Sequence, residues 1–195
     1  MSTKRVAIAA GVVGLAAVLV VGLVQLGGSP GAAPPSRLTL AQMRTALAGS
    51  PPPLAGLHAE ASELLGGGLP ALHTRLASLR GDPVVVNKWA SWCIPCRAEF
   101  GVFQRVSVSR GHEVAFIGID SGDSRGAAAA FLRSRPLSYP SYLDPDGSVG
   151  LAISDSGFTP VTVFYGAHGG FYIHQGPYPN VAALERDVAR YAVGA

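Results

Sequence analysis

Cysteine is scarce in this chain: its 195 residues contain only Cys93 and Cys96. Structural zinc takes four protein ligands, usually as two Cys pairs or as a Cys pair with a His pair. A third cysteine is missing, and the five histidines form no His-x-x-x-His or similar cluster, so the sequence does not favour a zinc site. Because no cysteine follows the N-terminal apolar run, anchoring through a lipidated cysteine is not expected either.

Charge of one sign is not concentrated anywhere in the sequence. The formal net charge is +3 and the pI about 9.1, but the arginines are scattered and no basic run follows the Lys4-Arg5 pair. Nucleic-acid binding therefore has no support. Hydrophobic residues make up 48% of the chain, which is enough for one globular domain with an ordinary core beyond the apolar start.

The longest apolar run lies near the N-terminus. It extends from Val6 through Val24 to Leu26, interrupted only by Gln25, and no charge follows before Arg37. About 20 apolar residues cross a bilayer, whereas a cleaved signal has an apolar region of about 7–15 residues. We therefore expect residues 1–26 to be a single-pass signal-anchor in the cell membrane, with the N-terminus cytoplasmic and the remainder outside. The alternative is cleavage near residues 31–33, Gly-Ala-Ala, whose small side chains suit a signal peptidase.

The next segment, residues 27–56, is rich in proline and glycine. This composition predicts an extended linker, with one short helix over residues 39–47. Residues 57–195 then form a single domain. Its first part, residues 57–79, has helical apolar spacing broken by Gly66–Gly68, which predicts two helices.

The two cysteines lie at a predicted strand-to-helix junction. Residues 84–90 are apolar and β-branched, as in a buried strand, and an amphipathic helical pattern begins at Pro95. The unpaired N–H groups and the dipole of a helix start stabilise a thiolate, so Cys93 is the predicted nucleophile. Cys96, one turn further along, is close enough to form a disulfide and is the predicted resolving thiol. Such a short disulfide loop stabilises little, so its value is chemical.

The remaining elements follow in a recognisable order. Alternation, turn signals and helix stops predict a strand over 113–120, a helix over 125–135, a short strand over 141–143, a hairpin of 160–165 with 170–174, and a helix over 181–191. A strand-helix-strand crossover followed by a hairpin and a closing helix is the thioredoxin order. We therefore expect an α/β thioredoxin fold, a central mixed β-sheet flanked by helices.

Two segments carry a family resemblance. Residues 85–100, Val-Val-Asn-Lys-Trp-Ala-Ser-Trp-Cys-Ile-Pro-Cys-Arg-Ala-Glu-Phe, resemble the active-site segment of extracytoplasmic thioredoxin-like proteins of the TlpA/ResA type. Residues 157–164, Gly-Phe-Thr-Pro-Val-Thr-Val-Phe, resemble the segment that holds the cis-proline of that family. The likeness covers about residues 82–193.

The resemblance implies roles for four further residues. Pro160, preceded by Thr159, should be cis and face the Cys pair as part of a substrate-binding surface; the alternative is an ordinary edge proline. Glu99 matches an acidic residue proposed to handle the proton of the buried thiol; the alternative is a surface Glu favoured by the helix dipole. Trp92 is expected to cover the sulfur and to contact the partner.

The sequence departs from the family pattern at four positions. Asn87 stands where thioredoxin itself has a buried, proton-handling Asp, although an Asn there is familiar in the TlpA/ResA group. Lys88 replaces the usual apolar residue, which leaves the burial of that face of the strand open. Gly101 takes the place of a proline that commonly kinks the helix, and Val161 follows the proline where Thr is usual. None of these changes removes the sulfur chemistry.

The resemblance implies a membrane-anchored, extracytoplasmic thiol-disulfide oxidoreductase with no bound cofactor. Its expected substrate is a disulfide in an exported protein such as apocytochrome c, and its expected electron donor is a CcdA/DsbD-type membrane carrier. The sequence leaves the physiological partner, the net direction and the reduction potential open.

Two rival functions remain at this point. A peroxiredoxin-like peroxidase shares the fold, but its Pro-x-x-x-Thr-x-x-Cys setting is missing. A Sco-like copper chaperone uses Cys-x-x-x-Cys with a distant histidine, and here the spacing is one residue short and only His168 or His174 could serve.

Overall fold

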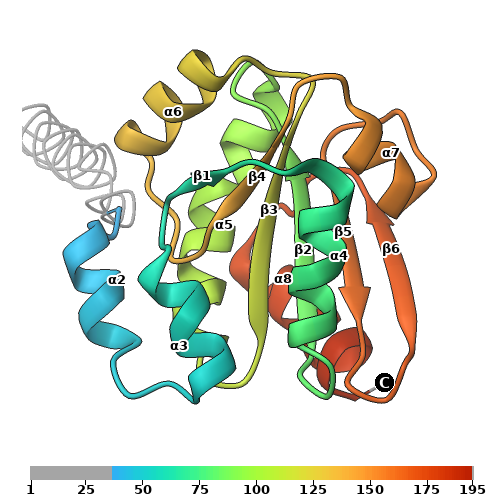
Figure 1. Ribbon diagram of the computed structural model, residues 1–195. Helices are drawn as coiled ribbons and strands as arrows, with labels where there is room; N and C mark the ends of the chain where they lie inside the picture. Colours follow the sequence, from blue (N-terminus) through green and yellow to red (C-terminus); the bar gives the residue numbers. More distant parts are fainter. Residues whose placement is uncertain (1–36, 195) are drawn as a thin grey trace, which may run out of the picture. The chain divides into compact units, whose positions relative to one another are not determined.

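A six-stranded mixed sheet forms the centre of the part of the chain that the computed structural model describes, residues 37–194 (Figure 1). Its strands are β1 (Leu64–Leu65), β2 (Val84–Trp89), β3 (Ala115–Ser121), β4 (Ser141–Asp144), β5 (Val161–Tyr165) and β6 (Phe171–Gln175). They lie in the order β1-β4-β3-β2-β5-β6. The first four are mutually parallel, whereas β5 is antiparallel to both β2 and β6. This arrangement confirms the expected thioredoxin-like sheet.

Helices cover both faces of this sheet (Figure 1). One layer consists of α3 (Pro52–Ala59), α4 (Gly68–Ser78) and α7 (Ser148–Ser154). The other consists of α5 (Ile94–Arg110), α6 (Arg125–Ser134), α8 (Val181–Asp187) and the π-helical turn η1 (Val188–Val193). A further short helix, α2 (Leu40–Ala46), precedes α3. Residues 37–194 therefore form two hydrophobic cores, one on each side of the sheet.

Strand β2 is buried along its whole length, because β3 and β5 flank it and helices cover both of its faces. Side chains alternate between the faces of a strand. Val85 and Trp89 accordingly join the core under α5, and Val84 and Val86 join the core under α4. Lys88 is buried too, with 3% of its surface exposed, so the open question about this face is settled in favour of burial.

The compact unit begins earlier than the sequence predicted. The predicted linker, residues 27–56, overlaps it: residues 37–56 contribute α2 and the start of α3. Met43 of α2 is fully buried, and the backbone N–H of Leu38 donates to Oε1 of Gln104 on α5 at 2.9 Å. Proline content predicted extension, but these tertiary contacts hold the segment on the domain. The rest of the predicted linker and the predicted anchor, residues 1–26, lie outside the described residues.

Most predicted elements are confirmed, and two short ones, β1 and α7, were not predicted. The two helices predicted within residues 57–79 correspond to α3, which begins already at Pro52, and α4, which starts at the predicted glycine break; the short strand β1 lies between them. Helix α7 was not predicted, because only seven residues separate Gly147, in the left-handed region at φ 77°, from Asp155, at φ 47°. Among residues 37–194, no helix is both long and apolar enough to cross a membrane.

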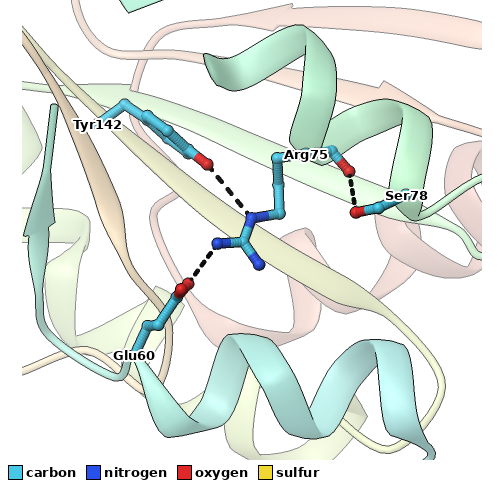
Figure 2. A network of polar contacts seen from close by, with 4 residues as sticks. All are labelled: Glu60, Arg75, Ser78 and Tyr142. Atoms are coloured by element: carbon cyan, nitrogen blue, oxygen red, sulfur yellow. Dashed lines mark hydrogen bonds and ion pairs between the residues drawn. The ribbon is translucent and has the colours of Figure 1, made fainter. Parts of the chain in front are cut away.

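A polar cluster ties the α3–α4 layer to the sheet (Figure 2). Arg75 of α4 donates from Nη2 to Oε2 of Glu60, the C-cap of α3, at 2.6 Å, and from Nε to the hydroxyl of Tyr142 on β4 at 3.2 Å. One guanidinium thus connects two helices and a strand. A planar group with several donors suits this three-way contact.

Gly118 of β3 provides a test of the packing behind the site. A Cβ atom there would lie 2.9 Å from Nε1 of Trp89 and would also meet the side chain of Ser141, which accepts the Trp89 N–H. Gly118→Ala should therefore lower the free energy of unfolding by about 1–3 kcal/mol, measured by chemical denaturation. Gly126→Ala in α6, where a Cβ meets nothing within 4 Å, is the matched control and should stabilise slightly. Equal behaviour of the two variants would contradict this account.

Candidate functional site

The two cysteines form a disulfide at the start of α5. Their Cα atoms are 5.3 Å apart. Cys93 is the N-cap residue of α5, and its Sγ accepts a hydrogen bond from the backbone N–H of Cys96 at 3.2 Å. Pro95 suits the first helical turn, because backbone N–H groups have no partner within the helix there and proline lacks one. The predicted helix-start position of Cys93 is confirmed, and the same N–H can donate to a thiolate when the disulfide opens.

The proline segment faces the cysteines from the start of β5. The Thr159–Pro160 peptide bond is cis, as the resemblance implied. The carbonyl oxygen of Thr159 lies 3.7 Å from Sγ of Cys93. Two segments 66 residues apart are thus brought together, because β5 pairs directly with β2, the strand that ends just before the cysteines. The ordinary edge-proline alternative is wrong.

Exposed apolar side chains lie next to these two segments. Trp92, Ile94 and Phe158 have 60%, 80% and 72% of their surface exposed, whereas the adjacent Cys93 is almost fully covered. The indole N–H of Trp92 donates to the carbonyl of Gly122 at 2.9 Å, which fixes its ring beside the Cys pair. Ile94 and Phe158 were not predicted as site residues, because residue type alone does not reveal exposure. Exposed apolar groups beside a reactive centre suit contact with a partner protein.

Glu99 is fully buried behind Cys96, so the alternative of a surface Glu is wrong. Its Oε1 accepts from Nδ2 of Asn87 at 3.0 Å, and its Oε2 accepts from the backbone N–H of Tyr178 at 2.9 Å. Burial raises the pKa of Glu99 to about 7, although both hydrogen bonds oppose that rise. Glu99 can therefore gain or lose a proton near neutral pH. The position that holds an Asp in thioredoxin is an Asn here, and that Asn contacts the acid.

Tyr178 is a residue that the sequence did not single out. It lies in the loop before α8, and besides holding Glu99 its hydroxyl donates to Oδ2 of Asp187 at 2.8 Å. Its ring stacks on His174 of β6, with 4.2 Å between the ring centroids. The amide that binds Glu99 is therefore held in place by a side chain fixed at both its ring and its hydroxyl. No local pattern announces this contact, since 79 residues separate Tyr178 from Glu99.

A second buried acid, Asp120, lies at the end of β3 beside Trp89 and was also missed. Burial raises its pKa to about 8, and the neighbouring Asp123 and Asp144 add to the rise. Asp123 in turn accepts the backbone N–H of Ser91 at 2.7 Å, just before the Cys pair. The negative charges of Asp123 and Asp144 disfavour a further charge at Asp120, so the protonated form of Asp120 is favoured.

Other ligand chemistry finds little support in this region. Among residues 37–194, no group of three or more His, Cys, Asp and Glu side chains is placed to hold a metal ion. His174, one of the two histidines considered for copper, packs on Tyr178 and lies 3.8 Å from Oδ2 of Asp187.

The titration of Glu99 predicts a pH-dependent stability. The folded protein keeps the Glu99 proton up to about pH 7, whereas an unfolded chain releases it near 4.5. Between these values the folded state binds more protons, so its unfolding free energy falls as pH rises, by about 3 kcal/mol. Glu99→Gln should remove this part of the slope, measured by denaturation of the oxidised protein at pH 4.5, 6 and 8.

Gln at this position has only one acceptor for two donors, so its absolute stability should be lower than that of wild type at pH 4.5, where Glu99 is protonated. The slope is therefore the readout. Asp120 contributes a similar slope to both proteins, and it cancels in their difference. Parallel stability curves for wild type and Glu99→Gln would show that Glu99 titrates normally.

Comparison with known proteins finds similarity to thiol-disulfide proteins. Residues 68–154 match the AhpC/TSA family. The DsbE thiol:disulfide interchange protein of Pseudomonas fluorescens biotype C is 38% identical over 94 residues, covering 48% of this chain and 51% of the relative. The ResA thiol-disulfide oxidoreductase of Bacillus subtilis is 31% identical over 75 residues, covering 38% and 42%. The solved structure of MTB DsbF shares 32% identity with a TM-score of 0.54, covering 58% of this chain and 83% of that one.

The chain thus spans about half the length of the curated relatives it matches. The matched region contains the Cys pair and Glu99 but ends before Pro160. Fold, Cys pair and relatives agree, so the resemblance noted in the sequence is confirmed: the chain carries a thioredoxin-family domain of the AhpC/TSA type, with homologues named DsbE and ResA.

Proposed function

We propose that this protein is a membrane-anchored, extracytoplasmic thiol-disulfide oxidoreductase that reduces disulfides in exported proteins. The observation that carries the proposal is the disulfide at the N-cap of α5, facing the Thr159 carbonyl that precedes cis-Pro160. The apolar side chains of Trp92, Ile94 and Phe158 beside it support docking of a partner protein. The names of the DsbE and ResA relatives agree with this chemistry.

The reaction starts from the reduced protein. The Cys93 thiolate attacks one sulfur of the partner's disulfide; that S–S bond breaks and the second partner sulfur leaves as a thiolate. Cys96 then attacks Cys93 in the mixed disulfide, which forms the Cys93–Cys96 disulfide and releases the partner as a dithiol. Two electrons pass to the partner. A dithiol donor must restore the reduced state, and a CcdA/DsbD-type membrane carrier is the donor we propose.

Proton handling falls to Glu99 in this scheme. Cys96 lies one helical turn before Glu99 and must lose its proton before it attacks Cys93. Asn87 and the backbone N–H of Tyr178 hold the Glu99 carboxyl by hydrogen bonds, and its pKa of about 7 matches a group that accepts and returns a proton near neutral pH. Glu99 is therefore the candidate base for Cys96.

Cysteine variants test the sulfur assignment. Cys93→Ser should abolish reduction of a protein disulfide, because no nucleophile remains at the helix start. Cys96→Ser should stop at the mixed disulfide, since nothing displaces the partner. The trapped species is measured by non-reducing electrophoresis and mass spectrometry of the full-length protein isolated from cells. The same capture identifies the partner, an apocytochrome c or another exported protein.

The double variant Cys93→Ser, Cys96→Ser is the control, because it keeps the fold and removes both thiols. Trapping by Cys93→Ser in place of Cys96→Ser would reverse the two roles. Rapid turnover of peroxide by wild type would point to the peroxidase alternative.

The apolar run of residues 6–24 supports the proposed location. The full-length protein should stay in the membrane fraction through high-salt and carbonate washes, because a spanning helix is not displaced by either. A membrane-impermeant thiol reagent should label the reduced Cys pair in intact cells. Recovery of a shortened soluble form that starts near Pro34 would show that the segment is a cleaved signal.

A further inference from the structure

Lys88 is a buried cation one residue before the end of β2. Only 3% of its surface is exposed, and its Nζ donates to the backbone carbonyl of Ser156 at 2.7 Å. The bond crosses 68 residues of sequence. Burying an ammonium group is unfavourable, and burial lowers the pKa of Lys88 accordingly. An apolar residue could fill the same space without this cost, so the charge calls for a role other than packing.

The surroundings of Lys88 fix its ammonium group at the loop that leads to Pro160. Asp144 provides the opposing negative charge, and its carboxylate accepts the backbone N–H groups of Val149 and Gly150 at the start of α7. A Cβ atom at Gly150 would lie 2.7 Å from Cε of Lys88. The lysine stem therefore runs closely past α7, in space that exists only because residue 150 is a glycine.

The carbonyl that Lys88 binds belongs to the segment that faces the disulfide. Ser156 also accepts, through its Oγ, the backbone N–H of Phe158 at 3.1 Å. Phe158 is the most exposed aromatic side chain beside the site, and Thr159, the next residue, places its carbonyl 3.7 Å from Sγ of Cys93. Two hydrogen bonds, from Lys88 to the Ser156 carbonyl and from the Phe158 N–H to the Ser156 hydroxyl, thus connect the Lys88 ammonium to the residues proposed to contact a partner.

We propose that Lys88 is a positioning residue that sets the location of residues 156–159, and so determines how well a protein partner fits beside the Cys pair. The proposal rests on the proposed function. Strand β2 then has two roles: it leads to Cys93, and through Lys88 it positions residues 156–159 on the other side of the Cys pair. Lys88 contacts neither sulfur nor partner and acts only through the Ser156 carbonyl.

The test uses two disulfide substrates of different size, with the full-length protein in reduced form. Insulin presents a disulfide within a polypeptide that must contact residues 156–159, whereas cystamine is too small to do so. Lys88→Met removes the ammonium and keeps a similar unbranched stem. It should raise KM for insulin about tenfold with kcat nearly unchanged, as expected for losing one charge-assisted hydrogen bond. The rate with cystamine should match wild type.

A second variant and a second readout keep the test independent of one substitution. Gly150→Ala places a Cβ atom 2.7 Å from Cε of Lys88 and 2.7 Å from Oγ of Ser121. It therefore displaces the Lys88 stem and should raise KM for insulin in the same way, while Gly126→Ala should change nothing. Hydrogen exchange at the Phe158 amide, measured by NMR, should be faster in both Lys88→Met and Gly150→Ala than in wild type.

The outcomes separate the two proposals. Equal losses on insulin and cystamine, or unchanged KM and unchanged Phe158 exchange, would overturn the role of Lys88. Wild type that reduces neither substrate would instead overturn the proposed function, whatever the Phe158 exchange shows.

Discussion

The site depends on one constraint: β2 is buried on both faces, yet two residues near its end, Asn87 and Lys88, have polar side chains. Asn87 and Lys88 are adjacent and point to opposite faces, so each must find a partner in a different core. Asn87 finds Glu99 of α5, and Lys88 finds the carbonyl of Ser156. The first contact sets the acid behind Cys96, and the second holds the segment opposite Cys93. The hydrogen bonds donated by these two buried side chains thus position both sides of the disulfide.

Protonation follows from the same burial. Glu99 and Asp120 lie on the face of the sheet that α5 covers, and burial raises the pKa of each, to about 7 and about 8. Below those values both acids are neutral, and they then place no negative charge beside a thiolate at the start of α5. Because Asp123 is bonded to Ser91, the charge state of Asp120 also bears on the turn that precedes the cysteines. The electrostatics of the site are therefore set by depth in the core rather than by surface charge.

How much the sequence could predict depends on whether a signal is local. The β2–α5 junction and the β5–β6 hairpin follow from short local patterns, the cis-proline was implied by the family resemblance, and the structure has all three where expected. Two hydrogen bonds of the site join residues far apart in the sequence. Tyr178 and Glu99 are 79 positions apart, and Lys88 and Ser156 are 68 positions apart. Local sequence patterns do not predict contacts of this kind. The prediction that the proline-rich residues before Leu57 are an extended linker was wrong for a related reason. The contact that holds them on the domain is with Gln104 of α5, far along the chain.

The residues of the site are spread along the chain, and those in its second half come together with the first only through the pairing of the strands. The family match covers residues 68–154, which include both cysteines, Asn87 and Glu99, but not Thr159, Pro160 or Tyr178. Thr159 and Pro160 reach the site because β5, which follows them directly, pairs antiparallel with β2, with Thr162 opposite Asn87 and Val161 opposite Lys88. A shift of this register by one residue would exchange the faces of β5 and move Pro160 relative to Cys93. The strand pairing that buries β2 is thus also what brings the two halves of the site together.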